Sequence, residues 1–267
     1  ELDIAIFNRS RHPIAPTPIG RKIIDQAKLT LTEMKKIPEI AHYEKDAVYG
    51  EVNVGIIPTI APYIVPNFFT FAKKHFPELT VRIHEIPTAQ QLYALNHGEL
   101  DISLLATREN GEDLLEIPLY EESLVLYASE GHKYLDIENI ETEMLDGDGL
   151  WVLRSEHCLS TQILSICHLK RDLSACYSAG NIYTLIDIVD AQGGYTVIPE
   201  FHCSMLSEEQ NKRVRRFTAP EPVRDVSLYI RSDYFKEGIL NAVAKCICGQ
   251  IPDNKLKKGF SKGIIKI

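Results

Sequence analysis

The sequence predicts an α/β fold of two lobes, preceded by a long helix. Three observations carry this prediction: an apolar stripe with helical spacing near the start, alternating strand and helix patterns after Gly50, and a second series of such units after about residue 150. Strands and helices that alternate at this spacing are typical of α/β folds with a largely parallel sheet. Two lobes joined by crossing strands would leave a cleft between them, and open α/β sheets bind ligands at the carboxyl ends of their strands.

The first expected element is an amphipathic helix that begins at Thr17-Pro18 and runs to about Tyr43. The threonine supplies an N-cap hydroxyl, and proline suits the first helical position. Apolar residues then recur every three or four positions, at Ile23, Ala27, Leu31, Met34, Ile37 and Ala41. Pro38 should kink this helix or begin a new segment. Such a stripe packs on its own domain or against a partner helix, and we expect a second copy of the chain to cover it.

The first lobe is expected to contain four strands, at residues 52–57, 80–85, 102–106 and 124–128. Helices are expected around residues 68–72 and at Thr88–Asn96, with Gly98 closing the second one.

The second lobe repeats the pattern. Strands are expected at 150–153, 175–178, 195–199 and 226–230, and helices at 158–168, 183–191 and 239–248. Gly193-Gly194 breaks the chain before the third of these strands, and the fourth leads back toward the first lobe. We therefore expect lobe I to comprise residues 49–126 and 229–256, lobe II residues 127–228, and a C-terminal tail residues 257–267.

Composition excludes several classes of function. A hydrophobic share of 45% and a charged share of 25% are ordinary for a globular protein, and 29 basic against 37 acidic residues give a net charge of −8. Such a chain does not bind nucleic acid through bulk charge alone. No stretch approaches the ~18 apolar residues of a membrane span and no secretory leader opens the sequence, so we expect a cytoplasmic protein.

Cofactor and metal motifs are missing from the sequence. GxGxxG, GxxxxGK[ST], HExxH and GxSxG do not occur, and the nine histidines are scattered without metal spacing, so we expect neither a cofactor nor a metal. The carboxylate pair Glu121-Glu122 is expected in a solvated loop. Most of the six cysteines are expected to be buried thiols, since Cys246-Ile247-Cys248 has no second pair with which to bind zinc.

Three loop segments form the candidate site because each follows a predicted strand and opens a helix toward the cleft: Ile57-Pro58-Thr59, Ile86-Pro87-Thr88 and Glu156-His157-Cys158. Local capping is the alternative explanation for both threonines. Thr59 can serve as an N-cap, and Thr88-Ala89-Gln90-Gln91 has the pattern of a capping box.

Cys158 stands out among the cysteines. The positive end of a helix dipole and the neighbouring His157 both favour the thiolate, so we expect a depressed pKa, although a structural cysteine remains the alternative. Cys167 lies among apolar residues and should stay protonated. Nine residues of continuous helix rise ~13.5 Å, whereas a disulfide needs Cα atoms within about 7 Å. The two thiols can therefore form a disulfide only if the helix unwinds. Such a pair of cysteines is a switch, unless the disulfide never forms.

A set of motifs along nearly the whole chain carries a family resemblance. The set comprises Val54-Gly55-Ile56-Ile57-Pro58-Thr59, Pro62-Tyr63, Phe76-Pro77, His84-Glu85, Gly98-Glu99-Leu100-Asp101, His157-Cys158-Leu159, Gln162, Cys167 and Pro220-Glu221-Pro222. Together they resemble the OxyR branch, the peroxide-sensing members of the LysR-type transcriptional regulators. The HCL…C spacing is the specific part. The resemblance implies two Rossmann-like lobes of periplasmic-binding-protein type II architecture after a linker helix.

By this resemblance, Cys158 matches the family's peroxidatic cysteine and Cys167 its resolving cysteine. Further positions would bind or activate peroxide around the reacting thiol: Thr59, Thr88, His157, Thr161 and Arg224. Thr161 departs from the family, which usually has an aspartate there, so a charge is lost.

The function implied is a hydrogen peroxide-sensing regulator of oxidative-stress genes, activated by a reversible Cys158–Cys167 disulfide and not an enzyme. Implied partners are promoter DNA, RNA polymerase, further copies in a homodimer or homotetramer, and a glutaredoxin- or thioredoxin-type reductant. Residues 1–16 look like the remnant of a winged DNA-binding domain and residues 17–48 like the linker and dimerisation helix, without the helix-turn-helix expected before them. The alternatives are a LysR-type regulator that responds to a small metabolite in the cleft, a thiol peroxidase and a periplasmic solute-binding protein.

Overall fold

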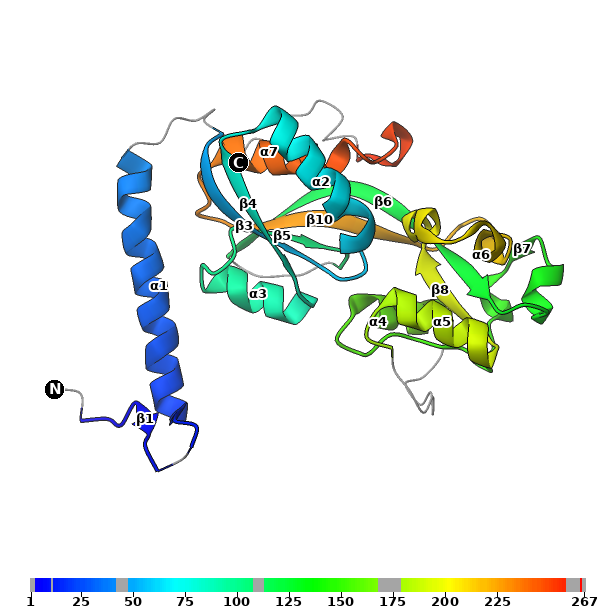
Figure 1. The fold of residues 1–267 in the computed structure, drawn as a ribbon, viewed down its shortest axis with the longest axis horizontal. Coiled ribbons are helices and arrows are strands. Elements are labelled where there is room, and N and C mark those ends of the chain that lie inside the picture. The colour runs from blue at the N-terminus through cyan, green and yellow to red at the C-terminus, as the bar shows by residue number, and fades with distance from the viewer. Residues whose placement is uncertain are drawn as a thin grey trace.

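Two strands cross between two lobes and join them in the structure, a computed structural model (Figure 1). The structure describes residues 3–10, 12–41, 48–107, 113–167, 179–257 and 265. The crossing strands are β6 (Leu114–Ala128) and β10 (Val223–Arg231), which pair antiparallel over the whole length of β10. At about 3.3 Å per residue, β6 is roughly 50 Å long and extends into both lobes. The two-lobed α/β fold with crossing strands is therefore confirmed.

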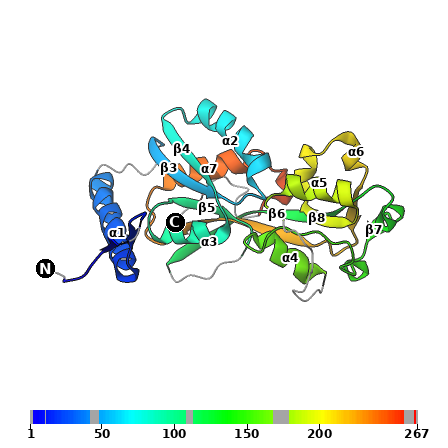
Figure 2. The same ribbon diagram turned by 60° about the horizontal axis from the view of Figure 1, so that its bottom comes forward.

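Lobe I contains the first of two separate hydrophobic cores. Its parallel strands are β3 (Gly50–Ile56), β4 (Leu79–Glu85) and β5 (Ile102–Leu105), and β10 pairs antiparallel with β5. The expectation of a largely parallel sheet holds for these three strands but is wrong for the whole sheet, because β10 returns from lobe II in the opposite direction and the lobe II partners of β6 are antiparallel to it. Helices α2 (Ala61–His75) and α7 (Glu237–Cys248) pack together on one face, and α3 (Thr88–Asn96) lies on the other (Figure 1, Figure 2).

Lobe II contains the second core. Strands β8 (Tyr195–Pro199) and β9 (Val214–Phe217) pair antiparallel with β6, and β7 (Asn139–Ile140) extends the sheet beyond β9. Its helices are α4 (Cys158–Ile166), α5 (Ile182–Gln192) and α6 (Glu208–Asn211), with the 3₁₀ turn η3 (Glu200–Met205) after β8. The remaining short elements are β1 (Phe7–Asn8), β2 (Ala15–Pro16), η1 (Lys133–Asp136), η2 (Thr142–Met144) and η4 (Asp253–Lys255).

Two strands expected in lobe II have different outcomes. Residues 150–153 make only isolated bridges, Leu150 to Tyr195 and Leu153 to Ala179, in place of a regular strand. The strand expected at 175–178 lies outside the described residues. The Gly193-Gly194 break is confirmed, with φ of +83° and +91°, a conformation that only glycine adopts at low cost.

Helix α1 (Pro18–Ala41) is the long helix that the sequence predicts. Its N-cap is confirmed, because the Thr17 hydroxyl accepts a hydrogen bond from the Gly20 N–H at 2.9 Å. The helix continues through Pro38, so the expectation of a new segment there is wrong. Apolar side chains on α1 are largely exposed: Leu31, Met34, Ile37 and Ile40. The part of the chain that the structure describes contains no helix both long and apolar enough to cross a membrane.

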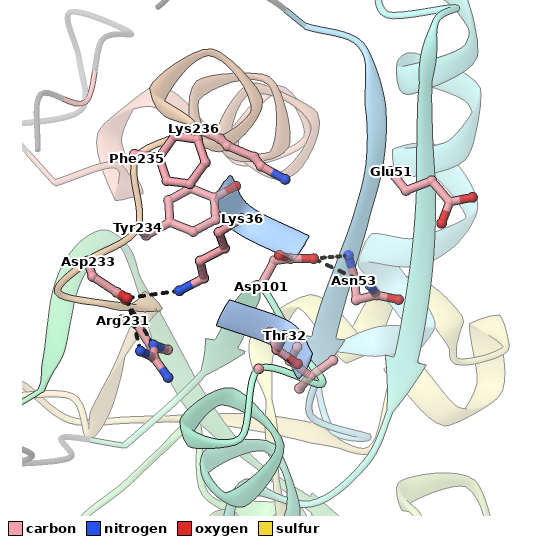
Figure 3. Close-up of a pocket in the computed structure, with 12 residues that line it drawn as sticks. Thr32, Lys36, Glu51, Asn53, Asp101, Arg231, Asp233, Tyr234, Phe235 and Lys236 are labelled. Atoms are coloured by element: carbon pink, nitrogen blue, oxygen red, sulfur yellow. Dashed lines mark hydrogen bonds and ion pairs between the residues drawn. The ribbon is translucent and has the colours of Figure 1, made fainter. Parts of the chain in front are cut away.

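Ion pairs, not the apolar stripe, link α1 to lobe I. Lys36 Nζ lies 2.8 Å from Asp233 Oδ2, and Arg231 bonds both Asp233, at 2.9 Å, and Glu33, at 3.2 Å. Lys28 and Glu99 form a separate pair at 2.9 Å. A cavity of about 260 Å³ lies between α1 and the lobe, and Figure 3 shows Lys36 and Arg231 converging on Asp233 at its edge. We call the Lys36–Asp233–Arg231–Glu33 group the clasp.

Asp233→Asn should loosen α1 without unfolding either lobe, because the variant removes the charge shared by Lys36 and Arg231. Amide exchange in α1, followed by mass spectrometry at low ionic strength, should rise by about two- to fivefold, which corresponds to the usual strength of exposed ion pairs. Glu209→Gln is the matched control, since it breaks the exposed Lys212–Glu209 pair of lobe II. Equal α1 exchange in Asp233→Asn and in this control would show that the clasp does not hold the helix.

The clasp should also depend on pH. Hydrogen bonding from Arg231, with a further contribution from Lys36, holds the pKa of Asp233 well below its usual range. A carboxyl group with a depressed pKa stabilises the docked state above its unperturbed pKa of about 4, and this stabilisation is lost as the pH falls through the folded-state value. In the parent protein, α1 exchange corrected for intrinsic rates should therefore increase only at acid pH.

Candidate functional site

The candidate site lies between the lobes, where helix α4 connects them. Cys158 is the first residue of α4 and packs, half-buried, against the core of lobe I although the helix belongs to lobe II. The Ser160 hydroxyl donates to the carbonyl of Leu153 at 2.6 Å and fixes α4 to lobe II. Gln162 Nε2 donates to the carbonyl of Ala106 at 2.6 Å and fixes it to lobe I. Helix α4 is thus held at both lobes, with the thiol at its N-terminus.

Arg224 supplies the positive charge near this thiol. It lies on β10, is 2% exposed, and its Nε and Nη2 donate to Glu122 Oε2 at 2.9 and 2.8 Å. Its Nη1 donates to Thr59 Oγ1 at 3.1 Å. Burial opposes the charge, but Glu122 more than offsets this, so the pKa of Arg224 lies above its ordinary value. The guanidinium is charged, fixed, and close enough to act on Cys158.

Glu122 corrects the sequence interpretation. It was expected in a solvated loop, yet it is fully buried in β6, directly opposite Arg224 in the strand register. The Tyr63 hydroxyl donates to Glu122 Oε2 at 2.9 Å, and the Phe201 N–H donates to Oε1 at 3.1 Å. A buried arginine needs a counter-ion. Glu122 could have been identified by pairing its strand with the strand of Arg224, because that pairing places the two residues opposite each other.

The two threonines do not cap their helices. The N-caps of α2 and α3 are Ile60 and Pro87, and neither makes a side-chain capping hydrogen bond. The interpretation of Thr59 and Thr88 as caps is therefore wrong. Thr59, which is 2% exposed, accepts from Arg224 instead. The Thr88 hydroxyl is buried, has no hydrogen-bond partner among the described residues, and lies where it favours the thiolate form of Cys158.

The pKa of the Cys158 thiol lies above its usual value, so the expected depression is wrong. Burial is the main cause. The Arg224 charge, the Thr88 hydroxyl and the first amide groups of α4 act in the opposite direction and favour the thiolate. No such charge or hydrogen-bond donor favours the thiolate of Cys167, and burial raises its pKa to about 11. Cys158 is therefore surrounded by groups that promote ionisation, and Cys167 is not, as its apolar setting predicts.

His157 and Thr161 are not brought against the thiol. The His157 ring is buried, and burial lowers its pKa, which favours the neutral imidazole. Its interactions in the described part of the chain involve Glu156, Gly180 and Arg154. Thr161 is exposed on α4, and no hydrogen bond links it to Cys158 among the described residues.

Helix α4 is continuous between the two cysteines. Cys167 follows its last residue, lies in the core of lobe II, and its N–H still donates to the carbonyl of Ile163 at 2.9 Å. A helix of this length places the two Cα atoms ~13.5 Å apart. Both thiols are free. The expected helical connection between separated thiols is confirmed. No group of three or more metal-ligating side chains occurs within the described ranges.

The chain is similar to known proteins in both sequence and structure. A model described as the LysR substrate binding domain matches residues 45–247. The hydrogen peroxide-inducible genes activator of Haemophilus influenzae is 31% identical over 234 residues, which cover 86% of this chain and 77% of that protein. The crystal structure of OxyR from Porphyromonas gingivalis aligns with a TM-score of 0.72 and 30% identity, over 78% of this chain and 96% of that one.

The chain belongs to the OxyR family of LysR-type regulators. The periplasmic-binding-protein type II architecture expected from the family resemblance is thereby confirmed. An H2O2-bound OxyR variant from Corynebacterium glutamicum also aligns, with a TM-score of 0.70 and 26% identity, over 99% of this chain and 85% of that one. This alignment extends over nearly the whole chain, beyond residues 45–247.

Thr88→Val should slow alkylation of Cys158 by about fivefold at neutral pH, because it removes a hydroxyl that favours the thiolate, an effect of ~1 kcal/mol for one polar group. The measurement is the rate of modification at Cys158 by a small alkylating agent, followed by peptide mass spectrometry. Thr161→Val is the matched control on α4 itself and should leave the rate unchanged. Equal slowing by both variants would contradict the placement of Thr88 against the thiol.

Proposed function

We propose that this chain senses hydrogen peroxide through Cys158 and passes the signal on through a disulfide with Cys167. One observation carries the proposal: the helix that starts at a thiol beside a buried arginine ends at a second thiol in the core of the other lobe. The family supports it, since relatives are named hydrogen peroxide-inducible genes activators and one related structure is described as H2O2-bound.

The chemistry proceeds in two balanced steps. The Cys158 thiolate attacks one oxygen of peroxide, the O–O bond breaks, and the departing hydroxide takes up a proton to give water and a sulfenic acid. The Cys167 thiol then attacks the sulfenic sulfur, and the hydroxyl leaves with the thiol proton as a second water. Thr59, Thr88 and Arg224 would orient the peroxide oxygens. His157 and Thr161 would take part only if their side chains turn toward the thiol.

The second step must rebuild helix α4. The Cα atoms have to move from ~13.5 Å apart to within about 7 Å, so helical hydrogen bonds between Cys158 and Cys167 must break. Cys167 would leave the core of lobe II, and the Gln162 contact with lobe I would be strained or lost. A disulfide that exchanges one packed arrangement for another is a two-state element suited to signalling.

In the whole regulator, the altered lobes would change how copies pack as a homodimer or homotetramer and hence how promoter DNA is held and RNA polymerase recruited. Residues 1–16 would belong to the winged DNA-binding domain and residues 17–48 to the linker helix. A glutaredoxin- or thioredoxin-type partner would reduce the disulfide in the bacterial cytoplasm. The chain would act stoichiometrically and not as an enzyme.

Thiol mapping by mass spectrometry, before and after one equivalent of H2O2, tests the proposal. The parent should form the Cys158–Cys167 disulfide. Cys158→Ser should abolish fast oxidation, because Cys167 lacks groups that favour its thiolate. Cys167→Ser should keep the first step and accumulate a sulfenic acid that over-oxidises to sulfinate. Cys203→Ser is the matched control: Cys203 is half-buried, and burial raises its pKa to about 11.

Three results would contradict the proposal. The first is fast oxidation in Cys158→Ser. The second is unchanged amide exchange across residues 158–167 after oxidation, which would show that no refolding accompanies the reaction. The third is steady peroxide consumption at an enzyme-like rate in the presence of a dithiol, which would favour a thiol peroxidase.

A further inference from the structure

One carboxylate, that of Glu122, contacts both lobes and the arginine of the site at once. Its Oε2 accepts from Arg224 and from the Tyr63 hydroxyl of α2 in lobe I. Its Oε1 accepts from the backbone N–H of Phe201 in η3 of lobe II. The Phe201 ring lies edge-on to the ring of Tyr63, at 5.7 Å between centroids. The side chain is fully buried, so bulk solvent does not compete for these hydrogen bonds.

The guanidinium of Arg224 is oriented by this carboxylate. Its Nε and Nη2 donate to Glu122, which leaves Nη1 directed at the Thr59 hydroxyl, and Nη2 also lies 3.3 Å from the Thr59 carbonyl. Without the carboxylate, only weaker neutral acceptors would hold the guanidinium. Glu122 also places a negative charge next to the positive charge that acts on Cys158, and so reduces the pull of Arg224 on the thiolate.

The other groups around the site do not take over this role. Among the described residues, the titratable side chains that interact with Arg224 or Glu122 come from three elements: Tyr63 on α2, Tyr120 on β6, and His202 and Cys203 on η3. Burial favours their uncharged forms near neutral pH, since it raises the pKa of both tyrosines and of Cys203 and lowers that of His202 to about 4.

We propose that Glu122 is a positioning residue for the reaction at Cys158, which holds Arg224 in place between the lobes and offsets part of its charge. The inference rests on the proposed function. It makes the reactivity of the thiol depend on the relative placement of the lobes, because the carboxylate that fixes Arg224 is itself fixed by one donor from each lobe.

Glu122→Gln tests the charge. The amide keeps the size of the side chain and removes its negative charge, so Arg224 should act undiminished on Cys158. The midpoint of the pH profile for alkylation of Cys158 should fall by about one unit, the lower end of the effect of a nearby charge. The rate of H2O2 oxidation, expressed per thiolate, should fall at least severalfold because the guanidinium is less firmly oriented. A purely structural role would lower thermal stability without moving the midpoint.

Tyr63→Phe tests the positioning with both charges retained, and it decides the question if Glu122→Gln does not fold. It removes one donor to Glu122 and one acceptor of Arg224. The alkylation midpoint should change little, while oxidation per thiolate should slow by about fivefold, as expected for one hydrogen bond. Equal oxidation rates in Tyr63→Phe and the parent would overturn the positioning role.

Lobe II offers a matched control, the Tyr127–Asp190–Arg213 group. The Tyr127 hydroxyl donates to Asp190 Oδ1 at 2.5 Å, and Arg213 Nη1 donates to the same oxygen at 2.8 Å. Asp190→Asn and Tyr127→Phe should leave both readouts at Cys158 unchanged. An unmoved or raised midpoint in a folded Glu122→Gln, or equal shifts in the control variants, would overturn the inference. Failure of the proposed function gives a different result, since the parent chain would then not oxidise at Cys158.

Discussion

The structure depends on one buried charge, the guanidinium of Arg224 on a strand that crosses between the lobes. A charge withdrawn from water is tolerated when it is paired and its remaining hydrogen-bond donors are satisfied. Glu122 lies directly opposite on the other crossing strand, and Thr59 and Tyr63 of lobe I complete the set. Phe201 of lobe II binds the same carboxylate. The relative placement of the two lobes therefore depends on one ion pair, because groups from both lobes form hydrogen bonds with it.

Helix α4 is a second link between the lobes, and the proposed function requires it to be rebuilt. Its N-terminal thiol packs on the core of lobe I and the thiol after its C-terminus on the core of lobe II. Side-chain hydrogen bonds also fix the helix, from Ser160 to its own lobe and from Gln162 to the other, and Leu159 and Ile163 pack in the core of lobe II. Under the proposed function, a covalent bond between Cys158 and Cys167 would exchange these contacts for others.

Much of the fold was predictable because its signals are local. The helix Thr88–Asn96, the cap at Thr17 and the Gly193-Gly194 break lie where periodicity and turn chemistry place them. The candidate site was less predictable. Glu122 pairs with a residue 102 positions away, so its neighbours in sequence suggest a solvated carboxylate pair. The expected pKa of Cys158 was wrong for a similar reason, because a helix-dipole argument does not include burial against the other lobe.

One arrangement both buries the Cys158 thiol and brings it close to the groups that favour its ionisation. Seating Cys158 on lobe I removes water and raises its pKa, and the same seating brings it to Thr88 and to Arg224, which lower it. If the lobes separated, the thiol would gain water but lose both groups. Under the proposed function, fixed neighbours in a buried site, and not exposure, would favour ionisation of the thiol, and a small uncharged oxidant is the kind of molecule that such a site would admit.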